Sequence, residues 1–439
     1  MLISEVRLHP VAVADAPLRS SYGRHAPYAL RTIVELKTTD GITGISETYG
    51  GERPLAALES VKELIIGRSP WDLTGFWLKL SERAAQEASG KGDDRSQTYM
   101  VPGENPLDQH ARTFAAIEVA CLDIIGKAVG LPLCDLTGGR ARSAPAFSAY
   151  LFYKHGGGGG MGDDAREDEY GECLDAPSMV RQCKQMIAKY GFDEIKLKGG
   201  VLDPDQEIET IRQLRAEFGP KYPLRIDPNC AWSVETSVMV GESLVEELSA
   251  GGYLEDPTAS MEGMGEVRRR LLAKGIDTPL ASNVATTCFE HLHPAQNHDA
   301  VQVVLSDPHY WGGIRNQQHL SKFCEALGMG LSMHSNNHLG VSMMIMAQAA
   351  ACCPHLTYAC DTHYPWQTEQ DEVVLGGRVP IVNGRVEIPN KPGLGVELDY
   401  DQLGRLTELY RKIPLRKRDD EAEMQKHVDP NWKRVLPRW

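Results

Sequence analysis

Three oxygen-bearing side chains follow three successive, mostly apolar runs in the middle of the chain. Asp227, Glu255 and Asn283 each come directly after such a run. Carboxylate and amide oxygens are hard donors of the kind that bind Mg²⁺. Each residue alone could instead cap the helix that follows its strand. Three of them at equivalent positions favour a metal site, so we predict that they bind Mg²⁺.

A pair of lysines precedes the first of these residues by one strand-and-helix interval. Lys196 and Lys198 alternate with Ile195 and Leu197, so both ammonium groups lie on one face of a strand. Burying them costs several kcal/mol unless anions pair with them. Metal-binding carboxylates or an anionic substrate would supply those anions, and a nearby divalent ion lowers a lysine pKa as a general base requires. An exposed edge strand is the alternative.

A histidine and a carboxylate end two later strands. His334 ends one strand and Asp307 ends the strand before it. A carboxylate on a neighbouring strand can hold a histidine in one tautomer and raise its basicity. Lys198 and His334 would then be two bases on opposite sides of one substrate, although His334 could also be a hydrogen-bonded core histidine. Two bases beside a metal that holds a carboxylate indicate α-proton abstraction, followed by elimination or reprotonation.

These residues end the strands of a regular series. From Lys198 to Asp361 the strand ends lie 24 to 29 residues apart, with helix-patterned segments such as 206–218 and 313–327 between them. Eight units, from the strand at 150–153 to the one at 357–361, are what a (β/α)8 barrel needs. An open doubly wound sheet is the alternative. Polar residues at nearly every strand end favour the barrel.

The first 145 residues have another pattern. Strand-like runs at 2–11, 32–38 and 42–48, the last two joined at Asp40-Gly41, precede helical patterns, which is typical of an α+β domain. We divide the chain into an α+β domain over 1–145, a barrel over 146–390 and a charged helical segment over 391–439.

One long insertion breaks the barrel rhythm. It follows residue 152 and contains glycines 156–160 and the acidic stretch 163–169. We expect it to be flexible and to form the margin of a lid. Its acidic flank argues against a nucleotide site.

Charge and cysteine usage exclude several classes of protein. With 46 Lys and Arg against 60 Asp and Glu, the net charge is −14, which argues against nucleic-acid and anionic-membrane partners. The 10 cysteines are scattered through apolar runs without a metal-binding spacing, as in a reduced, cytoplasmic protein. The longest near-apolar stretch, 341–353, is too short to span a bilayer.

The same residues resemble the motifs of a known family over nearly the whole chain. The chain resembles the mandelate-racemase-like group of the enolase superfamily and, within it, the glucarate dehydratase family. The most specific elements are His334-Ser-Asn-Asn-His338 and Arg418-Asp-Asp420; Lys196-Leu-Lys198, Asp227-Pro-Asn229, Glu255-Asp-Pro and 391–397 also match. The resemblance implies a modified TIM barrel and a capping domain that the C-terminal segment returns to complete.

The resemblance also implies a role for each motif residue. Asp227, Glu255 and Asn283 would bind Mg²⁺. Lys198 and His334 would be the paired bases, with Asp307 behind His334. Lys196 and Asn229 would steady the enediolate. The implied substrate contacts are His25, Thr98, Tyr150, Phe152, Asn336, His363 and Arg418.

The implied reaction is the dehydration of D-glucarate to 5-dehydro-4-deoxy-D-glucarate, with the epimer L-idarate accepted through the opposite base. A diacid explains the need for a distal Arg418. The loop at 20–24 and Gly312-Gly313 depart from the glucarate pattern, so another aldarate or aldonate such as galactarate is an alternative substrate. A non-catalytic sugar-acid-binding relative is an alternative of another class, but it would be expected to lack a base or a ligand. We also expect a homo-oligomer.

Overall fold

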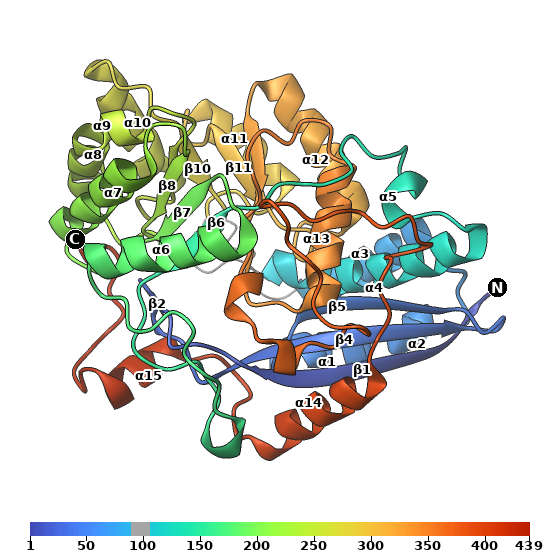
Figure 1. The fold of residues 1–439 in the computed structure, drawn as a ribbon. Helices are drawn as coiled ribbons and strands as arrows, with labels where there is room; N and C mark the ends of the chain where they lie inside the picture. The colour runs from blue at the N-terminus through green and yellow to red at the C-terminus, as the bar shows by residue number, and fades with distance from the viewer. Residues whose placement is uncertain (89–105) are drawn as a thin grey trace.

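The computed structural model describes residues 1–88 and 106–439 (Figure 1). Within these residues, seven parallel strands form a curled sheet in the order β12-β11-β10-β9-β8-β7-β6. All residues of these strands are buried except Gly330, as expected for a sheet covered by helices. The strands are β6 (Ala149–Phe152), β7 (Ile195–Lys198), β8 (Leu224–Asp227), β9 (Tyr253–Glu255), β10 (Leu280–Ser282), β11 (Val303–Ser306) and β12 (Gly330–Met333).

Helices follow the strands and cover the outside of the curled sheet (Figure 1). Local sequence signals mark where two of these helices begin. Asp175 and Ser178 form a capping box for α6, and Asp203 caps α7 just before Pro204. The helices of this part are α6 (Ala176–Tyr190), α7 (Pro204–Phe218), α8 (Val234–Ser243), α9 (Val245–Leu248), α10 (Met261–Ala273), α11 (Leu292–Asn297), α12 (Ile314–Leu327) and α13 (Gly340–Ala351).

The predicted eighth strand occupies the closing position but is irregular. Asp361 N donates to Met333 O of β12 (2.8 Å), and Ser148 N, just before β6, donates to Cys360 O (2.8 Å). Thr357 N and Tyr358 N both donate to Leu331 O, so the regular register is lost where the segment enters. Residues 357–361 therefore close the ring with an isolated bridge instead of a regular strand.

The N-terminal part forms a separate antiparallel sheet, which has the order β1-β4-β5 among the described residues. β4 and β5 are joined at Asp40-Gly41, where Gly41 has a φ of +84°, so the predicted hairpin is confirmed. The strands are β1 (Ile3–Ala14), β4 (Tyr28–Thr38) and β5 (Thr43–Tyr49), and a small hairpin pairs β2 (Arg19–Ser20) with β3 (Gly23–Arg24). The helices are α1 (Glu52–Ser60), α2 (Lys62–Ile65), α3 (Leu73–Ala88), α4 (Pro106–Val129) and α5 (Leu133–Leu136).

The C-terminal helices pack against this N-terminal sheet. α14 (Tyr400–Lys412) lies along β1 and α15 (Asp420–His427) lies beside β3, as the red and blue segments of Figure 1 show. We call the N-terminal sheet with α1–α4, α14 and α15 the cap. The exact domain limits at residues 145 and 390 stay predictions.

The helix α13 connects the cap with the barrel. All its residues are buried, since it packs against β5 of the cap as well as against α12. This contact explains the apolar run at 341–353. No helix in the described part of the chain is long and apolar enough to cross a membrane.

The glycine-rich insertion lies against the cap. His155 N donates to Pro17 O (3.1 Å) and Gly160 N donates to Pro27 O (2.7 Å). Lys154 Nζ pairs with Asp168 (2.8 Å), which fixes the two arms of the insertion to each other. Its flexibility and its role as a lid margin stay predictions.

Candidate active site

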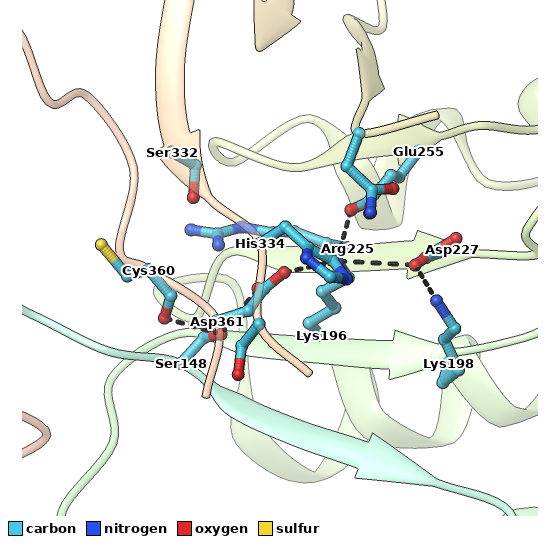
Figure 2. A network of polar contacts seen from close by, with 12 residues as sticks. Ser148, Lys196, Lys198, Arg225, Asp227, Glu255, Ser332, His334, Cys360 and Asp361 are labelled. Atoms are coloured by element: carbon cyan, nitrogen blue, oxygen red, sulfur yellow. Dashed lines mark hydrogen bonds and ion pairs between the residues drawn. The ribbon is translucent and has the colours of Figure 1, made fainter. Parts of the chain in front are cut away.

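The two lysines of β7 point into the ring of strands, so their predicted placement on one inner face is confirmed (Figure 2). Lys196 Nζ lies 2.5 Å from Glu255 Oε2 and 2.5 Å from Asp361 Oδ2. Lys198 Nζ lies 2.6 Å from Asp227 Oδ2. Carboxylates therefore compensate both buried ammonium groups.

The three predicted metal ligands come together at the same end of the sheet. Asp227 and Glu255 end β8 and β9, Asn283 follows β10, and all three are fully buried. Among the described residues, no three His, Cys, Asp or Glu side chains form a metal-binding group. A set of three oxygen donors here therefore needs the amide of Asn283.

The amide of Asn283 has two possible orientations. With its nitrogen toward the carboxylates, it donates to Glu255 Oε1 (3.3 Å) and Asp256 Oδ2 (2.8 Å) while its oxygen accepts from His334 Nε2 (3.2 Å). With its oxygen turned toward the carboxylates, three oxygens face one another. Only a cation between or beside them makes that second orientation favourable.

The charge of the site is also suited to a divalent cation. Asp227, Glu255, Asp256 and Asp361 bring four carboxylates together with two ammonium groups, so these residues carry an excess of two negative charges when ionised. Burial and the neighbouring Asp227 raise the pKa of Glu255 well above its usual range and that of Asp256 to about 6. A divalent ion would offset the excess charge. The donor set therefore fits Mg²⁺.

The second predicted base, His334, is buried just beyond the end of β12. Its Nδ1 lies 3.4 Å from Asp307 Oδ2, the predicted partner. Burial lowers the pKa of His334, and Asp307 opposes this shift. When the amide oxygen of Asn283 turns toward the carboxylates, Nε2 of His334 no longer has to donate to it. A neutral imidazole whose Nδ1 faces a carboxylate then presents Nε2 as the basic atom. The geometry thus places a candidate base just after β12, away from Lys198 on β7.

Asn229 lies beside the predicted metal ligand Asp227. Its backbone N and its Nδ2 both donate to Asp227 Oδ1, at 3.0 and 2.9 Å. Asn229 has a φ of 47°, a left-handed conformation that asparagine tolerates better than most residues. The turn therefore fixes the carboxylate of Asp227, and a contact of Asn229 with substrate stays a prediction.

Four of the predicted substrate contacts form an aromatic wall beside the lysines. The rings of Tyr150 and Phe152 lie 4.9 and 5.0 Å from that of His363, and the ring of His25 lies 6.2 Å from that of Phe152. Lys196 Nζ lies 4.7 Å from the centre of the Tyr150 ring. Tyr150 Oη is buried without a hydrogen-bond partner in the described residues, which suits a group that binds a ligand.

Two further predicted contacts, Asn336 and Arg418, line a cavity of about 110 Å³ between the cap and the loop after β12. The side chain of Arg418 is 43% exposed, and its Nε donates to Asp420 Oδ1 (2.6 Å), whose charge raises the pKa of Arg418. Thr98, the remaining predicted contact, lies outside the described residues.

Sequence reasoning missed several residues that complete this site. Asp361 pairs with Lys196, although its position at the end of the eighth segment was a usable signal. Asp256 directly follows Glu255. Tyr49 and His309 both bind Asp307, and only the position of Tyr49 at the end of β5 and the spacing of His309 from Asp307 mark them.

Comparison with known proteins places the chain in a family. Residues 178–402 match the family model described as enolase C-terminal domain-like, and residues 3–138 match that of the mandelate racemase / muconate lactonizing enzyme N-terminal domain. A probable glucarate dehydratase from Streptomyces coelicolor is 42% identical and is aligned over 100% of this chain and 99% of its own length.

Solved structures agree with this assignment. An enolase from Pseudomonas fluorescens with bound magnesium, potassium and tartrate has a TM-score of 0.92 and 42% identity, covering 100% of this chain and 99% of that one. An enolase from Thermobispora bispora complexed with magnesium and formate has a TM-score of 0.89 and 44% identity, covering 100% of both chains. The chain therefore belongs to the enolase superfamily and, within it, to the glucarate dehydratase-like family. The (β/α)8-type barrel with an α+β cap is that of the superfamily.

Proposed function

We propose that the chain is a Mg²⁺-dependent acid-sugar dehydratase that acts on D-glucarate. The observation that carries this proposal is the pair of candidate bases, Lys198 and His334. Lys198 ends β7 and His334 follows β12, so they lie on opposite sides of the strands β8–β10 that bring Asp227, Glu255 and Asn283 together. The identity of 42% with a probable glucarate dehydratase supports the substrate, and the magnesium of three solved relatives supports the metal.

The proposed reaction begins with removal of the α-proton. Asp227, Glu255 and Asn283 would hold Mg²⁺, and the charge of the ion would make that proton more acidic and would offset the negative charge that forms when it leaves. Lys198 or His334 takes the proton, depending on the face on which it lies. Lys196 would contact the substrate carboxylate next to that α-carbon and offset the negative charge that develops on it. Asn229, beside Asp227, would contact the other side of this substrate carboxylate.

Elimination completes the reaction. The bond from the neighbouring carbon to its hydroxyl breaks, and protonated His334 donates so that water leaves. This proton is the one that His334 has removed from its own epimer, or one that it already carries when Lys198 is the base. The resulting enol becomes a ketone, which gives 5-dehydro-4-deoxy-D-glucarate. Arg418 would bind the distal carboxylate, and the other contacts of the hydroxyl groups would come from the remaining residues that the resemblance assigns. These are His25, Thr98, Tyr150, Phe152, Asn336 and His363.

A substrate panel tests this proposal. Purified protein with Mg²⁺ is given D-glucarate, L-idarate, galactarate or the monoacid D-gluconate, and the keto product is measured as its semicarbazone. We expect product from D-glucarate and L-idarate. If only galactarate gives product, the substrate is another aldarate and not D-glucarate. If no acid sugar gives product, the result favours a non-catalytic binding protein. A cytoplasmic location and a homo-oligomeric state stay predictions.

A further inference from the structure

The carboxylate of Asp307 is held by more than the histidine it was predicted to serve. Its Oδ1 accepts from His309 Nδ1 (2.6 Å) and from His309 N (2.7 Å). Its Oδ2 accepts from the Tyr49 hydroxyl (2.8 Å), and the contact with His334 Nδ1 is the longest of the four at 3.4 Å. Three donors thus fix the carboxylate independently of His334.

His309 is itself held at both of its ring nitrogens. Its Nε2 lies 2.8 Å from the Ser342 hydroxyl, which can donate to it, while its Nδ1 faces Asp307. With one ring nitrogen at the serine hydroxyl and the other at the carboxylate, the imidazole has a fixed orientation and its Nδ1–H donates to Asp307. His309, Ser342 and Asp307 are all buried, so this orientation does not compete with bulk water.

Tyr49 reaches the same carboxylate from the cap. It ends β5, and Glu47 on the same face of that strand accepts from the backbone N of Leu339 (3.0 Å) and Ser342 (2.8 Å) at the start of α13. The guanidinium groups of Arg31 and Arg112 lie 4.9 and 4.2 Å from the centre of the Tyr49 ring. The strand β5 is therefore anchored to the barrel at two points, and one of them is Asp307.

We propose that Tyr49 is a positioning residue for the His334 base. With His309, it orients the Asp307 carboxylate before His334 gains a proton, so that His334 keeps one tautomer and one ring orientation during the reaction. This inference rests on the proposed two-base reaction.

The other base is held differently. Lys198 Nζ is paired with Asp227 (2.6 Å) and lies 5.9 Å from the centre of the Tyr150 ring. Both partners belong to strands of the barrel. The inference therefore predicts an asymmetry: losing the Tyr49 hydroxyl disturbs the chemistry of one substrate face and not that of the other.

Exchange of the α-proton isolates this asymmetry. The 4-deoxy analogues of D-glucarate and L-idarate keep the reacting α-proton but lack the hydroxyl that leaves, so each reports only the first step in D₂O with Mg²⁺. The variants Lys198→Met and His334→Asn identify which epimer uses which base. Tyr400→Phe is the matched control. The Tyr400 hydroxyl also donates to a carboxylate, that of Glu35 (2.6 Å), but Tyr400 lies on the surface of the cap.

We expect Tyr49→Phe to slow exchange of the His334-dependent epimer by about tenfold or more, the usual effect of losing a hydrogen bond to a charged group. The Lys198-dependent epimer should stay within about twofold of the wild type, and Tyr400→Phe should change neither. His309→Leu should act as Tyr49→Phe does, while His309→Asn should recover part of the rate since its amide can still donate to Asp307. Equal slowing of both epimers, or no change in either, would overturn the inference.

A spectroscopic readout does not require substrate. Imidazole N–H protons bound to carboxylates give downfield proton NMR signals, which the variants His309→Asn and His334→Asn assign. Tyr49→Phe should shift the signal of His334, and Tyr400→Phe should leave it in place. An unshifted His334 signal in Tyr49→Phe contradicts the positioning role, whereas a wild type that exchanges neither analogue contradicts the proposed function instead.

Discussion

The Nζ atom of Lys196 lies 2.5 Å from the Oδ2 atom of Asp361, at the position where the ring of strands closes. Lys196 is equally close to Glu255 Oε2. If Glu255 turns to bind Mg²⁺, Asp361 remains as the anion that compensates the buried ammonium group. The ion pair therefore leaves Glu255 available for the metal.

This relationship predicts the effect of Asp361→Asn on metal binding. Without the Asp361 charge, Lys196 should hold Glu255 more strongly, so the Kd for Mg²⁺ should rise by about tenfold, as for a lost charged hydrogen bond. Calorimetric titration of the folded variant with Mg²⁺ measures this. Asp168→Asn removes a different carboxylate that pairs with a lysine, Lys154, outside the site, and should leave the Kd unchanged. An unaltered Kd in Asp361→Asn would show that the ion pair does not serve the metal.

Removal of the metal should lower stability. An ion that binds the native state alone stabilises it by about 2.7 kcal/mol at a concentration of 100 times its Kd, so Mg²⁺ should raise Tm and EDTA should reverse the rise. Asn283→Leu removes the amide donor and should abolish the effect of Mg²⁺, whereas Asn297→Leu changes an exposed asparagine and should preserve it. Thermal unfolding followed by circular dichroism measures both variants. If EDTA does not change the Tm of the Mg²⁺-treated wild type, no stabilising metal binds at this site.

Arg418 should distinguish diacids from monoacids. Arg418→Met removes the cation proposed for the distal carboxylate, so KM for the diacid should rise by about 100-fold, within the range for loss of a partner of a charged group. A monoacid substrate should lose less than about twofold in kcat/KM. Arg411→Met, on an exposed face of α14 where Arg411 pairs with Glu408, is the control. Steady-state kinetics measure both effects. Equal losses for diacids and monoacids would show that Arg418 does not bind the distal carboxylate.

The loop that follows Lys198 should make stability depend on pH. Buried Glu207 accepts from the backbone N of Gly200, Val201 and Leu202. Burial nevertheless raises its pKa from 4.5 to about 7. Because the native state holds this proton more tightly than the unfolded state, the contribution is fully present below pH 4.5 and is lost as the pH rises through about 7.

The expected loss is about 3 kcal/mol in the free energy of unfolding, from 1.36 kcal/mol per pKa unit. Urea denaturation at pH 4.5, 6 and 8 measures it against Glu207→Gln, which should lack this component of the pH dependence. Parallel pH profiles for the two proteins would show that Glu207 titrates at its ordinary pKa.

Local periodicity was sufficient to predict much of the site. The alternation of Lys196 and Lys198 with two apolar residues fixed the face of β7 on which they lie. The strand-end positions of Asp227, Glu255 and Asn283 followed from regular spacing, because parallel strands bring their carboxyl ends to one edge. The hairpin at Asp40-Gly41 followed from turn chemistry.

Contacts between distant segments could not be predicted in the same way. The Tyr49 hydroxyl binds a carboxylate 258 residues away, and no local pattern encodes that pairing. Asp361 pairs with a lysine 165 residues away, and its position at the end of the eighth segment does not say which side chain it contacts. The return of the C-terminal helices to the cap came from the resemblance and not from helix periodicity, which does not say where an amphipathic helix packs.

In the proposed reaction two bases act on an acid sugar beside a metal, and proton NMR in D₂O follows both proton exchange and product formation. Protein, Mg²⁺ and D-glucarate should give the keto-deoxy diacid in one sample, while EDTA should prevent both product formation and exchange of the α-proton. Lys189→Met, which changes an exposed lysine paired with Glu169, should behave as the wild type. Lys198→Met and His334→Asn should each lose at least about 1,000-fold in removal of the α-proton from the epimer that depends on them. The proposed reaction is contradicted if the folded protein, supplied with Mg²⁺, neither exchanges the α-proton of any diacid nor forms product from one.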